Sequence, residues 1–342
     1  MTAVHGIDPA WKMDARLAAG RDAPRHSLVA ETMPGRADVT EANPIIGLYV
    51  LFHPDVQLGD DLERMLEAAG ATVRDSILSL NGYVVEATPT VARALAANDA
   101  VQWIEPALPK LSENNAEAAV MTQAADADTA PYGLDGTGVT AFIYDGGNIL
   151  ANHNDFQNRA TVIAGDTSGL SDHATHVAGT VGSRGTHTGM APEVTILSAG
   201  FEWDGSGTFL YTNPGDFEAD YTDAIALGAD LSNNSIGTNT APNGFDCDIT
   251  GDYGVMSSLI DAAVLGSLGG DIVVFWANGN ERQTTRCGST YSTTAPPATA
   301  KNHITVGALN ANNDTVTSFT SWGPVDDGRL KPDIAAPGCS TL

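Results

Sequence analysis

The sequence is poor in positive charge, and this shortage excludes two classes of partner. Its 342 residues contain 16 Lys+Arg against 42 Asp+Glu, which gives a formal net charge of −26. Nucleic acids and anionic membranes are bound through basic surfaces that replace the counterions of the phosphates. Both partners are therefore disfavoured. A strongly acidic surface favours solubility and is consistent with life outside the cell or in salt, although it says nothing about the fold.

Cysteine is also scarce. The three cysteines, Cys247, Cys287 and Cys339, are too few for a disulfide scaffold. Two alternatives stay open. Cys247 and Cys287 could pair in an oxidising compartment and leave Cys339 free, or all three could be ordinary thiols. The sequence does not supply the geometry that a bridge requires.

Long apolar runs are absent. No run approaches the roughly 18 residues of a membrane span, and 271–277 is among the longest. Residues 1–23 lack the apolar core of a secretory signal, so either the protein is not exported or a signal has been removed. The hydrophobic content of 42% is nevertheless sufficient for a sizeable buried core.

The chain is long enough for one small and one large domain. An N-terminal arm precedes the small domain, and a linker separates the two domains. Residues 1–43 show no sustained periodicity, and we interpret them as a loosely ordered N-terminal arm. Residues 44–107 predict the order strand, helix, strand, strand, helix, strand, which is the split βαβ pattern of a small α+β domain. Residues 108–130 form a polar, Ala/Asp-rich linker without a core-forming pattern.

Residues 131–342 show a different hydrophobic pattern. Apolar runs such as 139–144 and 272–276 alternate with helix-length segments at 172–182, 216–227 and 255–268. Strands that are apolar on both sides and alternate with helices predict a parallel sheet covered on both faces, hence an α/β domain.

Active sites of parallel sheets are found at the carboxyl ends of the strands. In this sequence, polar residues follow the predicted strands at these ends. Asp145 follows one strand, Asn280 follows another, and His173 begins a helix of small residues. An acid that orients an imidazole, a histidine that moves a proton and an amide that stabilises an oxyanion are three of the four parts of acyl transfer. Each signal alone is weak, since Asp and Asn-Gly-Asn after a strand are ordinarily turn residues.

A series of motifs, taken in order, resembles the subtilases, the S8 family of subtilisin-like serine proteases. The motifs are Ile143–Gly146, His173–Thr180, Ala191-Pro192, Asp204–Gly207, Asn234–Gly237, Ala277–Glu281, Pro296–Asn302, Phe319–Pro324 and Asp327–Gly338. The resemblance implies a three-layer α/β peptidase domain with a parallel sheet, and an endopeptidase that hydrolyses extended polypeptides. It also implies that residues 44–107 are a propeptide, which acts as folding chaperone and inhibitor. Because the linker is polar and unpatterned near Ser112–Asn115, we expect the zymogen to be cleaved there.

The resemblance assigns roles to individual residues. Asp145 and His173 match the aspartate and histidine of the catalytic triad, Asn280 matches the oxyanion-hole asparagine, and His176 is expected to lie in the shell around them. Two segments are expected to pair with the substrate backbone as strands, and a third to wall the pocket for the side chain before the cleaved bond. These substrate-binding residues are Gly205, Ser206 and Gly207, then Ser235, Ile236 and Gly237, and finally Trp276, Ala277 and Gly279.

The sequence departs from the family at the nucleophile. The motif Gly-Thr-Ser-Met-Ala does not occur, and Ser340, the nearest serine after the Ala-Pro-Gly motif, lacks its surroundings. We therefore expect the serine to lie downstream, in a C-terminal fragment or second chain, or to be missing, and residues 1–342 alone to be nearly inactive. Gly146 replaces the usual Thr or Ser and Ala174 the usual Gly, which fits either drift in an active enzyme or a non-catalytic relative.

Other readings of the same residues are weaker. A zinc site at His173 and His176 with His187 would lack the Glu of the His-Glu-x-x-His motif. No cofactor is required by the predicted chemistry. Structural calcium, known in some subtilases, has candidate loops at 246–252 and 310–314, although neither fits a defined motif and solvated acidic loops are favoured. A peptide-binding or inhibitory protein without activity, or half of a split protease, is the alternative function. The resemblance and the acidity predict a secreted or cell-envelope location.

Overall fold

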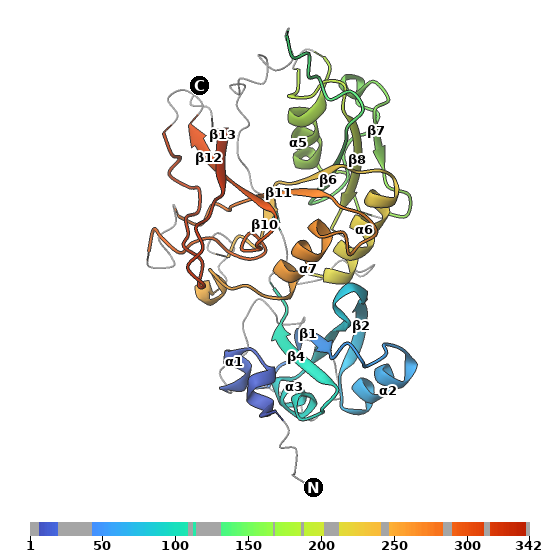
Figure 1. Ribbon diagram of the computed structural model, residues 1–342, viewed down its shortest axis with the longest axis vertical. Coiled ribbons are helices and arrows are strands. Elements are labelled where there is room, and N and C mark those ends of the chain that lie inside the picture. Colours follow the sequence, from blue (N-terminus) through green and yellow to red (C-terminus); the bar gives the residue numbers. More distant parts are fainter. Residues whose placement is uncertain are drawn as a thin grey trace. The chain divides into compact units, whose positions relative to one another are not determined.

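The computed structural model describes residues 7–19, 43–108, 112–113, 131–166, 168–185, 188–201, 212–240, 246–282, 289–310 and 315–339. The chain divides into two compact units (Figure 1). Unit 1 contains residues 1–110 and 204–218, and unit 2 contains residues 111–203 and 219–342.

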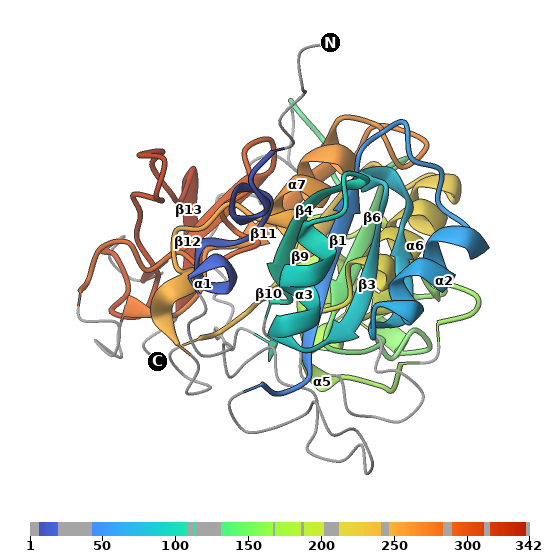
Figure 2. The same ribbon diagram turned by 90° about the horizontal axis from the view of Figure 1, so that it is seen from below.

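Unit 1 contains a four-stranded antiparallel sheet with the strand order β2-β3-β1-β4. The strand and helix order predicted for residues 44–107 is present. Its elements are β1 (Ile46–Phe52), α2 (Asp60–Ala68), β2 (Thr72–Ile77), η3 (Leu78–Leu80), β3 (Gly82–Ala87), α3 (Pro89–Ala96) and β4 (Val101–Pro106). Both helices cover the same face of the sheet (Figure 2).

Alternation along β1 explains this arrangement. Leu48 and Val50 enter one apolar core with Leu66 of α2 and Leu95 of α3. Tyr49 points to the other face, because successive strand residues alternate between the faces. Its hydroxyl donates to the carbonyl of Thr212, 2.8 Å away. Residues 212–218 therefore belong to unit 1 although they are distant in the sequence.

Part of the predicted N-terminal arm is ordered. Residues 7–19 contain the short helices η1 (Pro9–Lys12) and α1 (Ala15–Ala18). Met13 forms a parallel bridge with Ile104 at the edge of β4, and Met13 and Leu17 are buried in the core of unit 1. Two apolar side chains four residues apart are too few to produce a recognisable period, so the sequence pattern did not reveal this segment.

Unit 2 contains a seven-stranded parallel sheet with the order β13-β12-β11-β9-β6-β8-β7. Its strands are β6 (Thr140–Asp145), β7 (Ala160–Val162), β8 (Thr195–Gly200), β9 (Leu231–Asn234), β11 (Val273–Ala277), β12 (Ile304–Asn310) and β13 (Ile334–Cys339). A short antiparallel pair joins β5 (Ser112–Glu113) to β10 (Ile236–Gly237). The helical segments are η4 (Asn154–Phe156), α5 (Asp172–Gly182), α6 (Pro214–Ala226, beginning in unit 1), η5 (Cys247–Ile249) and α7 (Val255–Val264).

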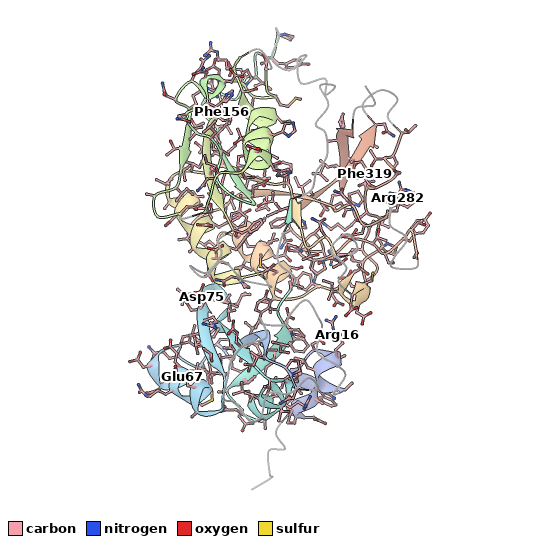
Figure 3. The ribbon with its side chains drawn as sticks, turned by 180° about the vertical axis from the view of Figure 1, so that it is seen from behind. Arg16, Glu67, Asp75, Phe156, Arg282 and Phe319 are labelled. Atoms are coloured by element: carbon pink, nitrogen blue, oxygen red, sulfur yellow. The ribbon has the colours of Figure 1, made fainter. Side chains whose placement is uncertain are left out.

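Helices cover both faces of the sheet at β6. Ala141 and Ile143 pack in one apolar core with Ala174 and Ala178 of α5. Phe156, labelled in Figure 3, belongs to the same core. The alternate residues Phe142 and Tyr144 contact the ring of Tyr221 on α6, with centroids 5.2 and 5.8 Å away. This is the three-layer arrangement that the alternation of strands and helices predicts.

None of the helices in the described ranges has both the length and the hydrophobicity that a membrane crossing requires. This agrees with the shortness of the apolar runs in the sequence.

A buried histidine makes the stability of unit 2 depend on pH. His303, beside the start of β12, is buried, and one ring nitrogen lies 2.8 Å from the hydroxyl of Thr305. Burial, together with the cation of Lys331, lowers the pKa of His303 to about 3. The folded state therefore keeps this ring neutral at pH values where the unfolded chain binds a proton.

We expect this group to stabilise the fold fully above pH 6.5 and to lose that contribution as the pH falls toward 3. The slope is about 1.4 kcal/mol per pH unit in that window, because one proton is bound on unfolding. Urea unfolding of the native protein and of His303→Gln between pH 3 and 8 measures the difference. Parallel pH profiles for the two proteins would contradict this expectation.

Candidate active site

The predicted site residues lie at one edge of the parallel sheet because of the strand register. Ile143 of β6, Asn233 of β9 and Phe275 of β11 are aligned across three adjacent strands. Two residues further along their strands stand Asp145 and Ala277. The carboxyl ends of parallel strands meet at the same edge, and adjacent strands are about 4.8 Å apart. The sheet thus brings together residues more than 130 positions apart in the sequence.

Asp145 faces α5 because of its place in β6. Ala141 and Ile143 pack against α5, so Asp145 points to the same face by the two-residue period of a strand. The Asp145 side chain is fully buried, and its Oδ1 accepts the N–H of Gly146 at 2.7 Å. A carboxylate taken out of water requires such donors.

His173 is held at the start of α5 by the helix cap. Ser171 is the N-cap residue, and its hydroxyl accepts the N–H of Ala174 at 3.1 Å. His173 is the second residue of the helix, and its Nδ1 lies 2.7 Å from Oδ1 of Asp145. Its side chain is 10% exposed. An ionised Asp145 accepts the Nδ1 proton and leaves Nε2 as a proton acceptor, which is the state that a general base needs.

The two departures from the family beside these residues are accommodated. Gly146 lacks a hydroxyl, but its N–H is bonded to Asp145. The methyl group of Ala174 is fully buried in the core between α5 and the sheet. Neither substitution disrupts the contact between Asp145 and His173.

His176 has an exposed side chain. It is on the same helix, three residues beyond His173. His187 lies outside the described residues. Within the described ranges, no group of three His, Cys, Asp or Glu side chains converges to hold a metal ion. Of the two acidic loops considered for calcium, 246–252 is described and 311–314 lies outside the described residues.

A cavity of about 240 Å³ lies at the carboxyl ends of β9 and β11 and extends along β12 and β13. Five of the predicted residues line it: Ser235, Trp276, Ala277, Gly279 and Asn280. Residues that the sequence analysis assigned no role complete the lining: Asn233, Asn234, Phe275, Asn278, Val306, Gly307, Ala308, Phe319, Thr320, Ala336, Pro337 and Gly338. Phe319 is labelled in Figure 3. The Phe319–Pro324 motif was the signal that pointed to part of this wall.

Of the other predicted substrate-binding residues, two form a short strand and three lie outside the described residues. Ile236 and Gly237 form β10, and they pair with Glu113 and Ser112 of β5 in antiparallel register. Gly205, Ser206 and Gly207 lie outside the described residues. Cys247 is disulfide-bonded, which excludes the alternative of three ordinary thiols, and Cys287, the partner considered for it, lies outside the described residues.

Buried hydrogen bonds hold the walls of the cavity. Asn278 is buried, donates to the carbonyl of Ser321, and accepts from the hydroxyl of Thr294 at 3.0 Å. The N–H of Ser321 donates to the carbonyl of Gly279 at 2.9 Å. Gly279 adopts φ +95°, a conformation that favours glycine. The turn that presents Asn280 is therefore fixed to the neighbouring loop.

A second buried network joins β9 to β11. The amide of Asn234 donates to the carbonyl of Phe275 at 2.9 Å and accepts from the hydroxyl of Tyr221 at 2.8 Å. Burial raises the pKa of Tyr221, so its hydroxyl remains a donor. Because Asn234 is the last residue of β9, this network fixes the sheet edge beside the cavity.

The Subtilase family model matches residues 148–342, which is more than half of the chain. The chain belongs to the subtilase family. The match contains His173 and Asn280 and begins three residues after Asp145. The subtilase is 32% identical over 227 residues to the serine protease AprX of Bacillus subtilis, covering 61% of this chain and 48% of AprX. It is 29% identical over 245 residues to proteinase T of Parengyodontium album, covering 64% of this chain and 73% of that protein.

Solved structures confirm the fold prediction. Fervidolysin from Fervidobacterium pennivorans, a keratinolytic enzyme related to subtilisin, superposes with a TM-score of 0.56 at 20% identity, covering 92% of this chain and 49% of fervidolysin. The epidermin leader peptide processing serine protease of Staphylococcus aureus gives a TM-score of 0.55 at 17% identity, covering 86% of this chain and 75% of that protease. At these identities the likeness concerns the fold alone. The matches span about half of the length of AprX and of fervidolysin.

We expect Asn278→Ala to lower the free energy of unfolding of the subtilase by about 2 kcal/mol, because it leaves the carbonyl of Ser321 and the hydroxyl of Thr294 buried without their partner. Denaturant unfolding measures this loss. Asn152→Ala, at an exposed asparagine, is the control and should change stability by less than about 0.5 kcal/mol. Equal effects of the two substitutions would show that the Asn278 network does not stabilise the fold.

Proposed function

We propose that this subtilase is the zymogen of a serine endopeptidase that hydrolyses extended polypeptides. The observation that carries the proposal is the 2.7 Å contact between Asp145 and His173 at the carboxyl edge of the sheet. Asn280 follows β11 at the same edge and lines the cavity that extends from there along β12 and β13. An oriented imidazole and an amide donor are the arrangement that acyl transfer requires.

In the proposed mechanism, Nε2 of His173 removes the proton of a serine hydroxyl while the oxygen attacks the carbonyl carbon of the scissile bond. Asp145 stabilises the imidazolium that forms, and the amide of Asn280 donates to the oxyanion. His173 then protonates the leaving amine, which breaks the C–N bond. Water deprotonated by His173 hydrolyses the acyl-enzyme and restores the serine. No cofactor takes part.

The proposed nucleophile is a serine outside residues 1–342, on a helix that covers one face of the sheet. The strand register places apolar side chains of β11, β12 and β13 on this face: Val273, Phe275, Ile304, Val306 and Ile334. Val273 is 47% exposed and Ile334 51%, whereas Ile272 and Val274, the neighbours of Val273 on the opposite face, are buried. Parallel sheets are normally covered on both faces. A helix seated there, in the same polypeptide or another, would begin near the edge that holds His173.

The proposed substrate lies along β10 as an added strand. In support of this, β10 already pairs in antiparallel register with Ser112–Glu113 of the chain's own linker. Main-chain pairing of this kind gives affinity without a demand on sequence. The linker thus takes the position that the proposal gives to the substrate, as an intramolecular inhibitor would. This is also where we place the maturation cleavage.

Contacts within unit 1 support a propeptide role for residues 44–107. Asp75 accepts the side-chain amide of Asn213 at 2.8 Å, and Glu218 accepts the N–H of Ser79 at 2.7 Å. Together with the bond between Tyr49 and Thr212, these contacts join residues 44–107 to the segment before α6 and to its fifth residue. A domain that binds and orders the start of a peptidase helix is suited to assist its folding.

We place the protein outside the cytoplasm, secreted or in the cell envelope. The disulfide bond of Cys247 is the supporting observation, since such bonds persist in oxidising compartments. The net charge of −26 is compatible with that location. Calcium in the acidic loops remains a proposal that equilibrium dialysis of the protein against the ion would test.

The test of the peptidase proposal is a serine-complete protein, made by joining residues 1–342 to the Gly-Thr-Ser-bearing segment of a subtilase relative. We expect it to be labelled at that serine by a fluorophosphonate probe and to hydrolyse peptides. His173→Ala should lower kcat by about 10⁶-fold, as for a residue acting within a triad. Asn280→Ala should lower kcat by about 10²–10³-fold, as for one lost oxyanion donor.

Residues 1–342 alone are the control and should remain unlabelled. Labelling of a serine within them would contradict the external nucleophile. A folded serine-complete protein that binds peptides but never hydrolyses them would favour the non-catalytic alternative.

The linker makes a separate prediction about the zymogen. Glu113→Pro removes a backbone donor from the strand that pairs with β10, so we expect the unprocessed, serine-complete protein to hydrolyse a short peptide several-fold faster. Ala118→Pro in the same linker is the matched control. Mass spectrometry of processed protein should find its new N-terminus between residues 107 and 130. An N-terminus within 45–106 would rule out the propeptide assignment.

A further inference from the structure

Two loops that carry Asp145 and His173 are joined by backbone hydrogen bonds. The N–H of Asn148 donates to the carbonyl of Gly169 at 2.7 Å, and the N–H of Ser171 donates to the carbonyl of Asn148 at 2.8 Å. Asn148 is three residues from Asp145, and Ser171 is two residues from His173. The alignment of these loops therefore sets the distance between the carboxylate and the imidazole.

The packing of these loops leaves no room for side chains. A Cβ atom on Gly147 would lie 2.5 Å from the carbonyl oxygen of Gly169, and one on Gly200 would lie 2.5 Å from Cα of Gly147. Gly200 ends β8 and is paired in register with Asp145. Backbone thus packs directly on backbone where β6, β8 and the segment before α5 meet.

One carboxylate connects all three segments. Oδ1 of Asp166 accepts the N–H of Ser168 at 2.6 Å and the side-chain amide of Asn148 at 3.1 Å. Its Oδ2 accepts the N–H of Gly200 at 2.6 Å. The Asn148 amide also donates to the carbonyl of Ser168 at 3.2 Å, and this side chain is buried. Hydrogen bonds to an ionised acceptor are the stronger class.

We propose that Asp166, acting with Asn148, is a positioning residue that sets the alignment of the Asp145 and His173 loops. Asp166 contacts neither residue of the pair and acts through Gly200 and Asn148. The inference rests on the proposed function, since it deepens the account of the same site. The carboxylate faces three N–H donors, an environment that suits an anion and not a metal ion.

The chemistry of position 166 can be separated from its volume. Asparagine has the shape of aspartate but only one oxygen, and its NH₂ group accepts no hydrogen bond. In Asp166→Asn, at least one of the three N–H donors therefore loses its acceptor. Asp172→Asn is the matched control, because it removes the same charge from an exposed residue adjacent to His173.

The experiment uses residues 1–342 and needs no nucleophile. Proton NMR detects the Nδ1 proton of His173 that is shared with Asp145, identified by its loss in His173→Gln, and its exchange rate with water is measured. We expect Asp166→Asn to accelerate the exchange by about 10- to 100-fold, the range for a lost hydrogen bond to a charged group. Asn148→Ala should act in the same direction to a smaller extent, and Asp172→Asn should stay within about twofold. Circular dichroism verifies the fold of each variant.

The outcomes separate this inference from the proposed function. A native protein without the shared proton would overturn both, because no aligned pair would exist. If the native protein has the shared proton but its exchange rate is unchanged in Asp166→Asn, only the positioning role is overturned. Should Asp166→Asn fail to fold, unchanged exchange in Asn148→Ala overturns the role. In the serine-complete protein, a lower kcat at constant KM agrees with positioning, and a raised KM at constant kcat contradicts it.

Discussion

The hydrogen bond between Asp145 and His173 is the contact on which the proposed catalytic site depends. It forms because two local rules agree in space. The alternation of β6 points Asp145 toward α5, and the serine cap places His173 in the first turn of that helix. The surrounding glycines are needed because the three segments approach backbone to backbone. Sheet, helix and loop thus converge on a single contact of 2.7 Å.

On the side of the cavity, the site is held together by a different kind of interaction. Around the cavity, buried amides replace ionised groups: Asn234 and Asn278 each bond to main-chain carbonyls of neighbouring segments. Neutral amides suit this position because a buried charge without a partner would cost far more than a satisfied amide. The result is a hydrogen-bonded wall that presents the Gly279–Asn280 turn.

The two unusual surfaces of unit 2 have a common explanation in the proposed zymogen. One face of β11, β12 and β13 is apolar and partly exposed, and the β10 edge is occupied by the chain's own linker. In the proposal, the first surface receives the segment that carries the nucleophile and the second receives the substrate. A strand edge and an apolar sheet face both favour association with another segment of chain.

Much of this protein was determined by the sequence alone. The strand and helix order of residues 44–107 and the parallel sheet follow from hydrophobic periodicity, and the identities of Asp145, His173 and Asn280 follow from their places after strands and in family motifs. Only the tertiary structure revealed the short helices of residues 7–19, the pairing of β5 with β10, the cavity wall at Phe319 and the hydrogen bonds of Asp166. The physical reason is the range of the interactions: periodicity reports on neighbours within a few residues, whereas these contacts join backbone and polar groups tens of residues or more apart and leave no periodic trace.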